Sequence, residues 1–125
     1  MFLFHKVIVA GGRDFNNYRL LSFHLGNMRK AILANDIADD MEIVCGKAKG
    51  ADSLGERWGK EHHVSVAEFP ADWDRYGRSA GPKRNKQMGD YADTLIAFWD
   101  GKSRGTLNMI NYSKKIGLNV FVVDY

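Results

Sequence analysis

The chain has 125 residues, of which 45% are hydrophobic and 26% charged, and its formal net charge is +3. This length supports one hydrophobic core, and this composition is that of a globular protein rather than a disordered one. The longest apolar runs, at 7–10 and 120–123, are far shorter than the roughly 20 residues of a membrane span. We therefore expect one domain over residues 1–125 that does not bind a membrane.

Cellular location and bound metals are constrained by the N-terminus and by the cysteine count. Residues 1–6 lack the charged start and the cleavage site of a signal peptide. The one cysteine, Cys45, excludes an internal disulfide, offers no zinc-ligand spacing, and is expected to be a small core residue. We expect a cytoplasmic protein without a cofactor or a metal site.

Hydrophobic patterning predicts five strands that alternate with helices. Strands are predicted at 5–10, 41–45, 64–69, 94–99 and 118–123, and helices at 18–35, 51–62, 82–91 and 106–116. Residues 70–82 are expected to form an irregular loop, with Pro82 in the first turn of the next helix because it has no N–H to leave unpaired. Its aromatic residues, Trp73 and Tyr76, form either a lid over a site or a small hydrophobic cluster.

This alternation predicts an α/β fold, in which a parallel sheet has helices on both faces. Right-handed crossovers make the fold Rossmann-like, and we expect the strand order 3-2-1-4-5. In such sheets a ligand binds at the carboxyl ends of the strands, close to the point where the strand order reverses. The loops that leave strands one, two and four, and the start of the third helix, are therefore the places to search for a site.

The loop after the first strand reads Gly11-Gly12-Arg13-Asp14. Its two glycines allow the backbone to approach a ligand closely, and Arg13 can fork onto a phosphate or carboxylate. Asp14 is expected to accept from a ribose hydroxyl or to hold Arg13. A tight turn with a surface ion pair is the alternative, but the position in the fold favours a ligand.

The loop after the second strand, 46–52, leads directly into a helix. The N-terminus of a helix has free N–H groups and a positive dipole end, which hold anions, and Lys47 and Lys49 add positive charge. The segment lacks the Gly-Lys-Ser/Thr ending of a P-loop. The predicted ligand contacts are Gly46, Gly50, Ala51 and Asp52. For Asp52, capping the helix is an equally weighted alternative.

The third helix begins at Pro82-Lys83-Arg84-Asn85, with two adjacent cations. Basic residues at a helix N-terminus are unfavourable unless an anion is nearby, and this favours an anionic ligand. We predict that Arg84 and Asn85 reach into the cleft. A solvated basic helix start is the alternative.

The loop after the fourth strand, 99–106, is predicted to cradle a phosphate through Gly101, Ser103, Gly105 and Thr106. Helix capping by Ser103 is the alternative, and it explains the serine but not both glycines. Trp99 either stacks on a base or belongs to the core.

Taken in order, these four motifs resemble the SLOG superfamily. The motifs are Gly-Gly-Arg-Asp-Phe, Gly-x-Ala-x-Gly-Ala-Asp, Gly-Pro-x-Arg-Asn and Trp-Asp-Gly-x-Ser-x-Gly-Thr, and they are most similar to the small stand-alone YspA/YpsA-related branch. The resemblance implies a Rossmann-like fold and nucleotide-derived ligands. The superfamily that these motifs resemble also includes the cytokinin-activating phosphoribohydrolases and the DNA-processing protein A group, which binds single-stranded DNA.

The resemblance to the phosphoribohydrolases carries phosphate binding over better than hydrolysis. Those enzymes use a Gly-Gly-x-Gly-Thr segment that is followed closely by a catalytic glutamate. Gly105-Thr106 match the Gly-Thr pair, Gly101 serves for an earlier glycine, and Arg84 matches the family's arginine, but the glutamate position holds Asn108 or Met109. Asparagine cannot act as a general acid or base near neutral pH.

Three functions follow as hypotheses. In the leading one, the chain binds a nucleotide or nucleotide-derived phosphate, as a sensor or a processing protein. In the second, it hydrolyses the N-glycosidic bond of nucleoside monophosphates, with Asp14, Asp52 and Arg84 as catalytic candidates and Asp100 as the remaining loop carboxylate. In the third, less favoured one, it binds nucleic acid through Lys47, Lys49, Lys83, Arg84 and Lys86. A homo-oligomer is expected under all three, because the resemblance implies pairing.

Overall fold

The computed structural model describes residues 1–125 and contains one five-stranded parallel sheet. Its strands are β1 (Phe4–Gly11), β2 (Asp40–Cys45), β3 (Ser65–Glu68), β4 (Thr94–Trp99) and β5 (Asn119–Asp124). They lie in the order β3-β2-β1-β4-β5, and every neighbouring pair is parallel. The predicted Rossmann-like class and strand order are therefore confirmed.

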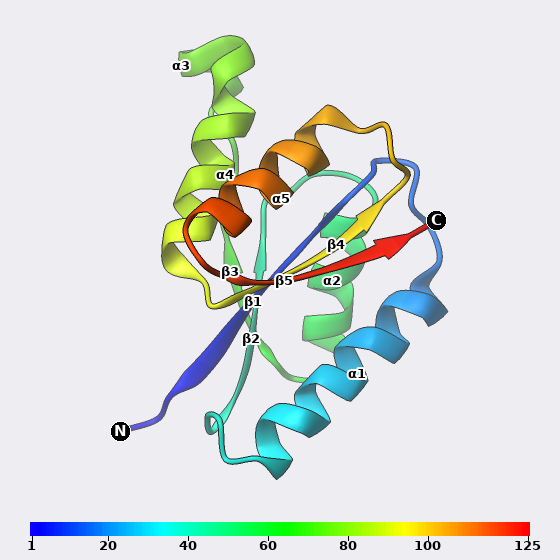
Figure 1. The fold of residues 1–125 in the computed structure, drawn as a ribbon, viewed down its shortest axis with the longest axis vertical. Helices are drawn as coiled ribbons and strands as arrows, with labels where there is room; N and C mark the ends of the chain where they lie inside the picture. The colour runs from blue at the N-terminus through cyan, green and yellow to red at the C-terminus, as the bar shows by residue number, and fades with distance from the viewer.

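Four main helices cover the sheet from both sides (Figure 1). They are α1 (Tyr18–Ala34), α2 (Ala51–Glu61), α4 (Ala80–Tyr91) and α5 (Arg104–Lys115). Helices α1 and α2 lie on one face of the sheet, and α4 and α5 lie on the other (Figure 1). No helix is both long enough and apolar enough to span a membrane.

The segment between β3 and α4 differs from the predicted irregular loop. It contains the short helix α3 (Trp73–Tyr76) and the 3-10 helix η1 (Gly77–Ser79). The Asp72 carboxylate caps α3 by accepting from the N–H of Arg75 at 3.2 Å. Helix α4 begins two residues before Pro82, which still lies in the first turn, where its missing N–H costs no hydrogen bond.

The core consists of two hydrophobic clusters, one on each side of the sheet. On β1, Val7 and Val9 face the α1–α2 side, whereas Ile8 and Ala10 face the α4–α5 side. This alternation with both faces buried is typical of a central strand in a parallel sheet covered by helices. Cys45 is fully buried, as expected of a small core residue.

The strand order also fixes where a site can form. The chain builds β1, β2 and β3 outward in one direction and then returns to place β4 on the other side of β1. The loops after β1 and β4 therefore separate in opposite directions, and an open space remains between them at the carboxyl edge of the sheet.

Candidate functional site

A cleft of about 1130 Å³ opens at this edge. Residues from all four predicted motifs line it: Gly11, Gly12, Arg13, Asp14, Gly46, Asp52, Arg84, Asn85, Ser103, Gly105 and Thr106. The structure thus brings together segments that lie up to about 95 positions apart in the sequence, as expected where parallel strands end at a common edge. The other predicted contacts, Gly50, Ala51, Trp99 and Gly101, do not line the cleft.

Gly50 and Ala51 instead hold the loops after β1 and β2 together. The backbone of Gly50 has φ +78°, and a Cβ there would lie 2.1 Å from the carbonyl oxygen of Gly12. The N–H of Ala51 donates to that same oxygen at 3.4 Å. Only glycine permits this close approach, so Gly50 and Ala51 support the first loop, while Gly46 and Asp52 of the same segment line the cleft.

Asp14 does not hold Arg13, which was one of its two predicted roles. Its carboxylate accepts a hydrogen bond of 2.6 Å from the hydroxyl of Tyr125, which lies just beyond β5. Arg13 is exposed and has no carboxylate within 4 Å, so its guanidinium is free to bind an anion. Burial raises the pKa of the Tyr125 hydroxyl, and Asp14 raises it further, so Tyr125 stays protonated as the donor.

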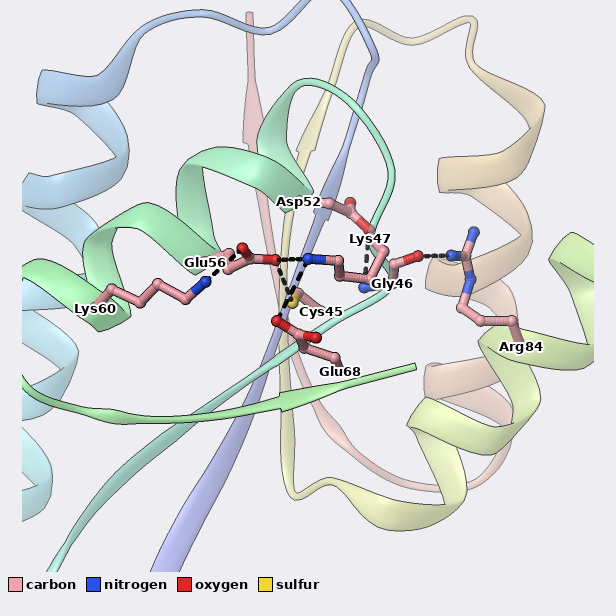
Figure 2. Close-up of polar contacts among 8 residues, drawn as sticks. All are labelled: Cys45, Gly46, Lys47, Asp52, Glu56, Lys60, Glu68 and Arg84. Carbon is pink, nitrogen blue, oxygen red and sulfur yellow. Dashed lines mark hydrogen bonds and ion pairs between the residues drawn. The ribbon is translucent and has the colours of Figure 1, made fainter. Parts of the chain in front are cut away.

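Asp52 does not cap α2. The N-cap position is Gly50, which has no side chain, and Asp52 lies in the first helical turn, where the residue is only 5% exposed. Its Oδ2 accepts from the N–H of Gly46 at 3.0 Å, and Figure 2 shows the carboxylate directed at that backbone. Burial raises the pKa of this carboxyl to about 6, against the opposing effect of Arg84 and of nearby backbone N–H groups.

Arg84 and Asn85 join the walls of the cleft. The Arg84 guanidinium donates to the carbonyl oxygen of Gly46 (Figure 2), and its Nε donates to the Asn85 Oδ1 at 3.1 Å. The Asn85 Nδ2 donates to the Gly105 carbonyl at 3.3 Å and to the Asn108 Oδ1 at 2.9 Å. Both side chains reach the cleft as predicted, and the same contacts connect α4 with the β2 loop and with α5.

The positive charge of the cleft comes only partly from the predicted lysines. The Lys47 ammonium lies 2.8 Å from Glu56 and 3.4 Å from Glu68, on the side of the loop away from Arg84 (Figure 2). Sequence reasoning did not identify Arg78 and Arg104, which line the cleft. Arg104 lies within the predicted loop 99–106 but was given no role, and Arg78 lies on η1, which was not predicted.

The loop after β4 is built to start α5. Ser103 is the N-cap, and its Oγ accepts from the N–H of Thr106 at 3.4 Å, so the capping interpretation is correct. The Asp100 carboxylate accepts from the N–H groups of Lys102 and Ser103, each at 2.8 Å, and these bonds lower its pKa. Gly101 has φ +80° and serves this turn rather than lining the cleft.

The first turn of α5 faces the cleft with unused donors. The N–H groups of Arg104 and Gly105 donate to no atom of the chain, as is usual for the first residues of a helix. Arg104 and Gly105 are exposed and line the cleft, and a Cβ added to Gly105 would meet nothing within 4 Å, so there is room beside this turn. The arrangement is a positive helix end, with an arginine and two hydroxyl-bearing residues beside it, that opens into a cleft.

A model of the YspA, cpYpsA-related SLOG family matches residues 5–76, more than half of the chain. The chain belongs to this family. The SLOG chain is also 34% identical over 84 residues to the Gene 61 protein of Mycobacterium phage D29, a match that covers 62% of this chain and 67% of the phage protein.

The fold of this SLOG chain is similar to that of DNA processing protein A (DprA) from Streptococcus pneumoniae. The two structures superpose with a TM-score of 0.67 at 19% sequence identity, over 95% of this chain and 50% of DprA. The chain spans about half the length of DprA, and at this identity the likeness concerns the fold.

The SLOG site contains three carboxylates. Asn108 and Met109, the two residues expected at the glutamate position of the phosphoribohydrolases, both line the cleft, and the Asn108 amide oxygen accepts from Asn85. Asp14, Asp52 and Asp100 line the cleft from the β1, α2 and β4 loops. No group of three or more histidine, cysteine or acidic side chains is arranged to hold a metal ion.

Trp99 belongs to the core. Its indole N–H donates to the carbonyl oxygen of Ser103 at 3.0 Å, and its ring packs against the cluster on the α4–α5 side of the sheet. The aromatic ring that does line the cleft is Trp73 of α3.

Proposed function

We propose that this protein binds a nucleotide or nucleotide-derived ligand whose phosphate lies at the N-terminus of α5. The observation that carries this proposal is the difference between two helix ends at the same cleft. At α2 the chain's own Asp52 carboxylate already lies in the first turn. At α5 the N–H groups of Arg104 and Gly105 are unpaired and face open space, which suits an external anion.

The charge of the cleft supports the same proposal. Its basic side chains are Arg13, Lys47, Lys49, Arg78, Arg84 and Arg104, and its acidic ones are Asp14, Asp52 and Asp100. Asp14 and Asp100 are engaged by Tyr125 and by backbone N–H groups. An excess of cations in a concave site attracts and retains an anionic ligand.

Titration calorimetry of the wild type against nucleoside mono- and diphosphates and nucleotide sugars tests this proposal, with Gly105→Asp and Gly105→Asn as matched variants. Either side chain has room, and an aspartate in the first turn also suits the helix dipole, so both variants are expected to fold. Gly105→Asp adds a carboxylate beside the free N–H groups, where it repels the phosphate of the ligand. We therefore expect it to weaken binding about tenfold or more, roughly the effect of 1.4 kcal/mol.

The uncharged Gly105→Asn variant is expected to keep most of the affinity. Two results contradict the proposal: a folded wild type that binds no compound of the panel, or equal losses in the aspartate and asparagine variants.

A second candidate function is hydrolysis of the N-glycosidic bond of nucleoside monophosphates. It is favoured by one observation: Asp52 lines the cleft and the pKa of its carboxyl is raised to about 6 by burial. A carboxyl with a pKa near the working pH is suited to proton transfer to a leaving base.

Incubation with nucleoside monophosphates, followed by chromatography for free base, tests this candidate. Turnover by the wild type and its loss in Asp52→Asn are the expected results for an enzyme. Release of no more base than a heat-inactivated sample gives removes hydrolysis and leaves the binding function standing.

A further inference from the structure

Trp73 is the one tryptophan with an exposed ring surface at the cleft. Trp58 is 1% exposed, and the indole N–H of Trp99 is bonded to the Ser103 carbonyl. Trp73 lines the cleft and is 51% exposed. Its indole therefore offers a planar apolar face and an N–H donor to a ligand in the cleft.

The chain positions this ring without covering it. Helix α3 is fixed by its Asp72 cap, and one edge of the indole lies over Gly81, where an added Cβ would be 3.2 Å from the ring. No aromatic ring or cation of the chain stacks on Trp73, and its N–H donates to no acceptor.

The neighbouring aromatic residue shows the contrast. Tyr76, on the same short helix, does not line the cleft, and two cations lie over its ring, Arg75 at 5.1 Å and Lys83 at 4.8 Å from the centroid. The two aromatic residues are thus in different states: Tyr76 is occupied by the chain's own cations, whereas the Trp73 ring faces solvent in the cleft.

We infer that Trp73 is the base-stacking wall of the site, so that the cleft takes a ligand that joins a planar aromatic base to a phosphate. This inference rests on the proposed function and adds a second contact to it. The phosphate lies at α5, and the base lies against the indole on α3, which forms another wall of the same cleft. Indole rings bind bases through stacking, which tolerates different bases because each has a π face.

Calorimetry with paired ligands tests the inference. The four ribonucleoside 5′-monophosphates carry base and phosphate, whereas ribose 5-phosphate carries the phosphate alone. We expect Trp73→Ala to weaken binding of the nucleotides about tenfold, within the range measured for loss of one base–aromatic stack, and to leave ribose 5-phosphate binding within about twofold. Trp73→Phe is expected to restore most of the loss, and the control Tyr76→Ala to change neither ligand's affinity.

Tryptophan fluorescence gives an independent readout on the wild type. Nucleotide is expected to quench the exposed Trp73, whereas ribose 5-phosphate is not, and Trp73→Phe is expected to abolish the quenching. Equal effects of Trp73→Ala on both ligand types, or no effect on either, overturn the inference while nucleotide binding stands. If the folded wild type binds neither ligand type, the proposed function fails, and the stacking inference fails with it.

Discussion

Asp52 shows how a single residue links the cleft to the stability of the fold. The carboxyl is buried in the first turn of α2, and its pKa rises from an ordinary value of 3.8 to about 6. Between these pH values the unfolded chain releases the proton while the folded chain keeps it. Stability from this group is therefore fullest below pH 4, falls as the pH rises to about 6, and is constant above that.

We expect Asp52→Asn to remove this pH dependence. The shift corresponds to about 3 kcal/mol. From pH 4 to pH 7 the unfolding free energy of the wild type should therefore fall by roughly that amount relative to that of Asp52→Asn. Urea unfolding at several pH values measures it. Asp36→Asn, on an exposed turn, is the control and should follow the wild-type profile; an Asp52→Asn profile parallel to the wild type contradicts the assignment.

Gly50 gives a second test at the residue scale. Gly50→Ala combines a left-handed backbone with a Cβ placed 2.1 Å from the Gly12 oxygen, so we expect a loss of about 3 kcal/mol or more in unfolding free energy. Gly26→Ala is the matched control, because Gly26 lies inside α1 with nothing within 4 Å of an added Cβ. It should stabilise the chain by up to about 1 kcal/mol. Equal losses at both positions contradict the role given to Gly50.

The sequence identified the site loops better than the roles of single residues in them. The predicted start of α2 at residue 51 is confirmed, but the apolar pattern does not tell which residue caps the helix, and the N-cap is Gly50 rather than Asp52. Tyr125 was missed because its contact with Asp14 crosses the sheet edge between chain segments 111 positions apart. Arg13 and Asp14 are neighbours in the sequence, which suggested an ion pair between them, but the Asp14 carboxylate accepts from the Tyr125 hydroxyl instead.

At the scale of elements, strong periodicity predicted the five strands and the four main helices. Helix α3 was missed because four residues make one turn, which is too short to show a repeated apolar face. The start of α5 was placed at residue 106 rather than Arg104, because the glycine at 105 reads as loop although it adopts a helical conformation.

The Ser103 N-cap of α5 is expected to stabilise the fold. Ser103→Ala removes the acceptor for the Thr106 N–H and should cost about 1 kcal/mol of unfolding free energy. Ser79→Ala is the control, because Ser79 is also at an N-cap position, that of α4, but makes no capping bond; its exposed hydroxyl donates only to the Tyr76 carbonyl. Urea unfolding of both variants measures the difference. A loss at Ser79 equal to that at Ser103 contradicts the capping role.

At the scale of the whole molecule, the fold followed from few rules. Alternation of strands and helices requires parallel pairing, and right-handed crossovers leave few strand orders. The distribution of charge did not follow from the sequence in the same way. Composition gives a net charge of +3, but which cations face the cleft depends on ion pairs that form only in the fold, such as that of Lys47 with Glu56.

This distribution leads to a prediction about nucleic acid. Of the basic residues first considered for that role, Lys47 is held by two glutamates and Arg84 by the Gly46 carbonyl. Three lysines remain that form no ion pair, at 49, 83 and 86, all of them exposed, although Lys83 also lies over the Tyr76 ring. With about three phosphate contacts, the logarithm of the association constant for a single strand should fall with the logarithm of salt concentration with a slope near −2.

Fluorescence anisotropy with a 20-nucleotide single-stranded DNA between 50 and 200 mM salt measures this slope. We expect weak binding with a slope of about −2 or shallower, since each single-strand contact contributes roughly 0.7. Lys83 does not line the cleft. If it contacts a phosphate, the charge reversal Lys83→Glu removes about one contact and should make the slope shallower by roughly 0.7. A slope steeper than about −4 requires six or so contacts, more than these three lysines supply, and favours nucleic-acid binding over a small nucleotide ligand.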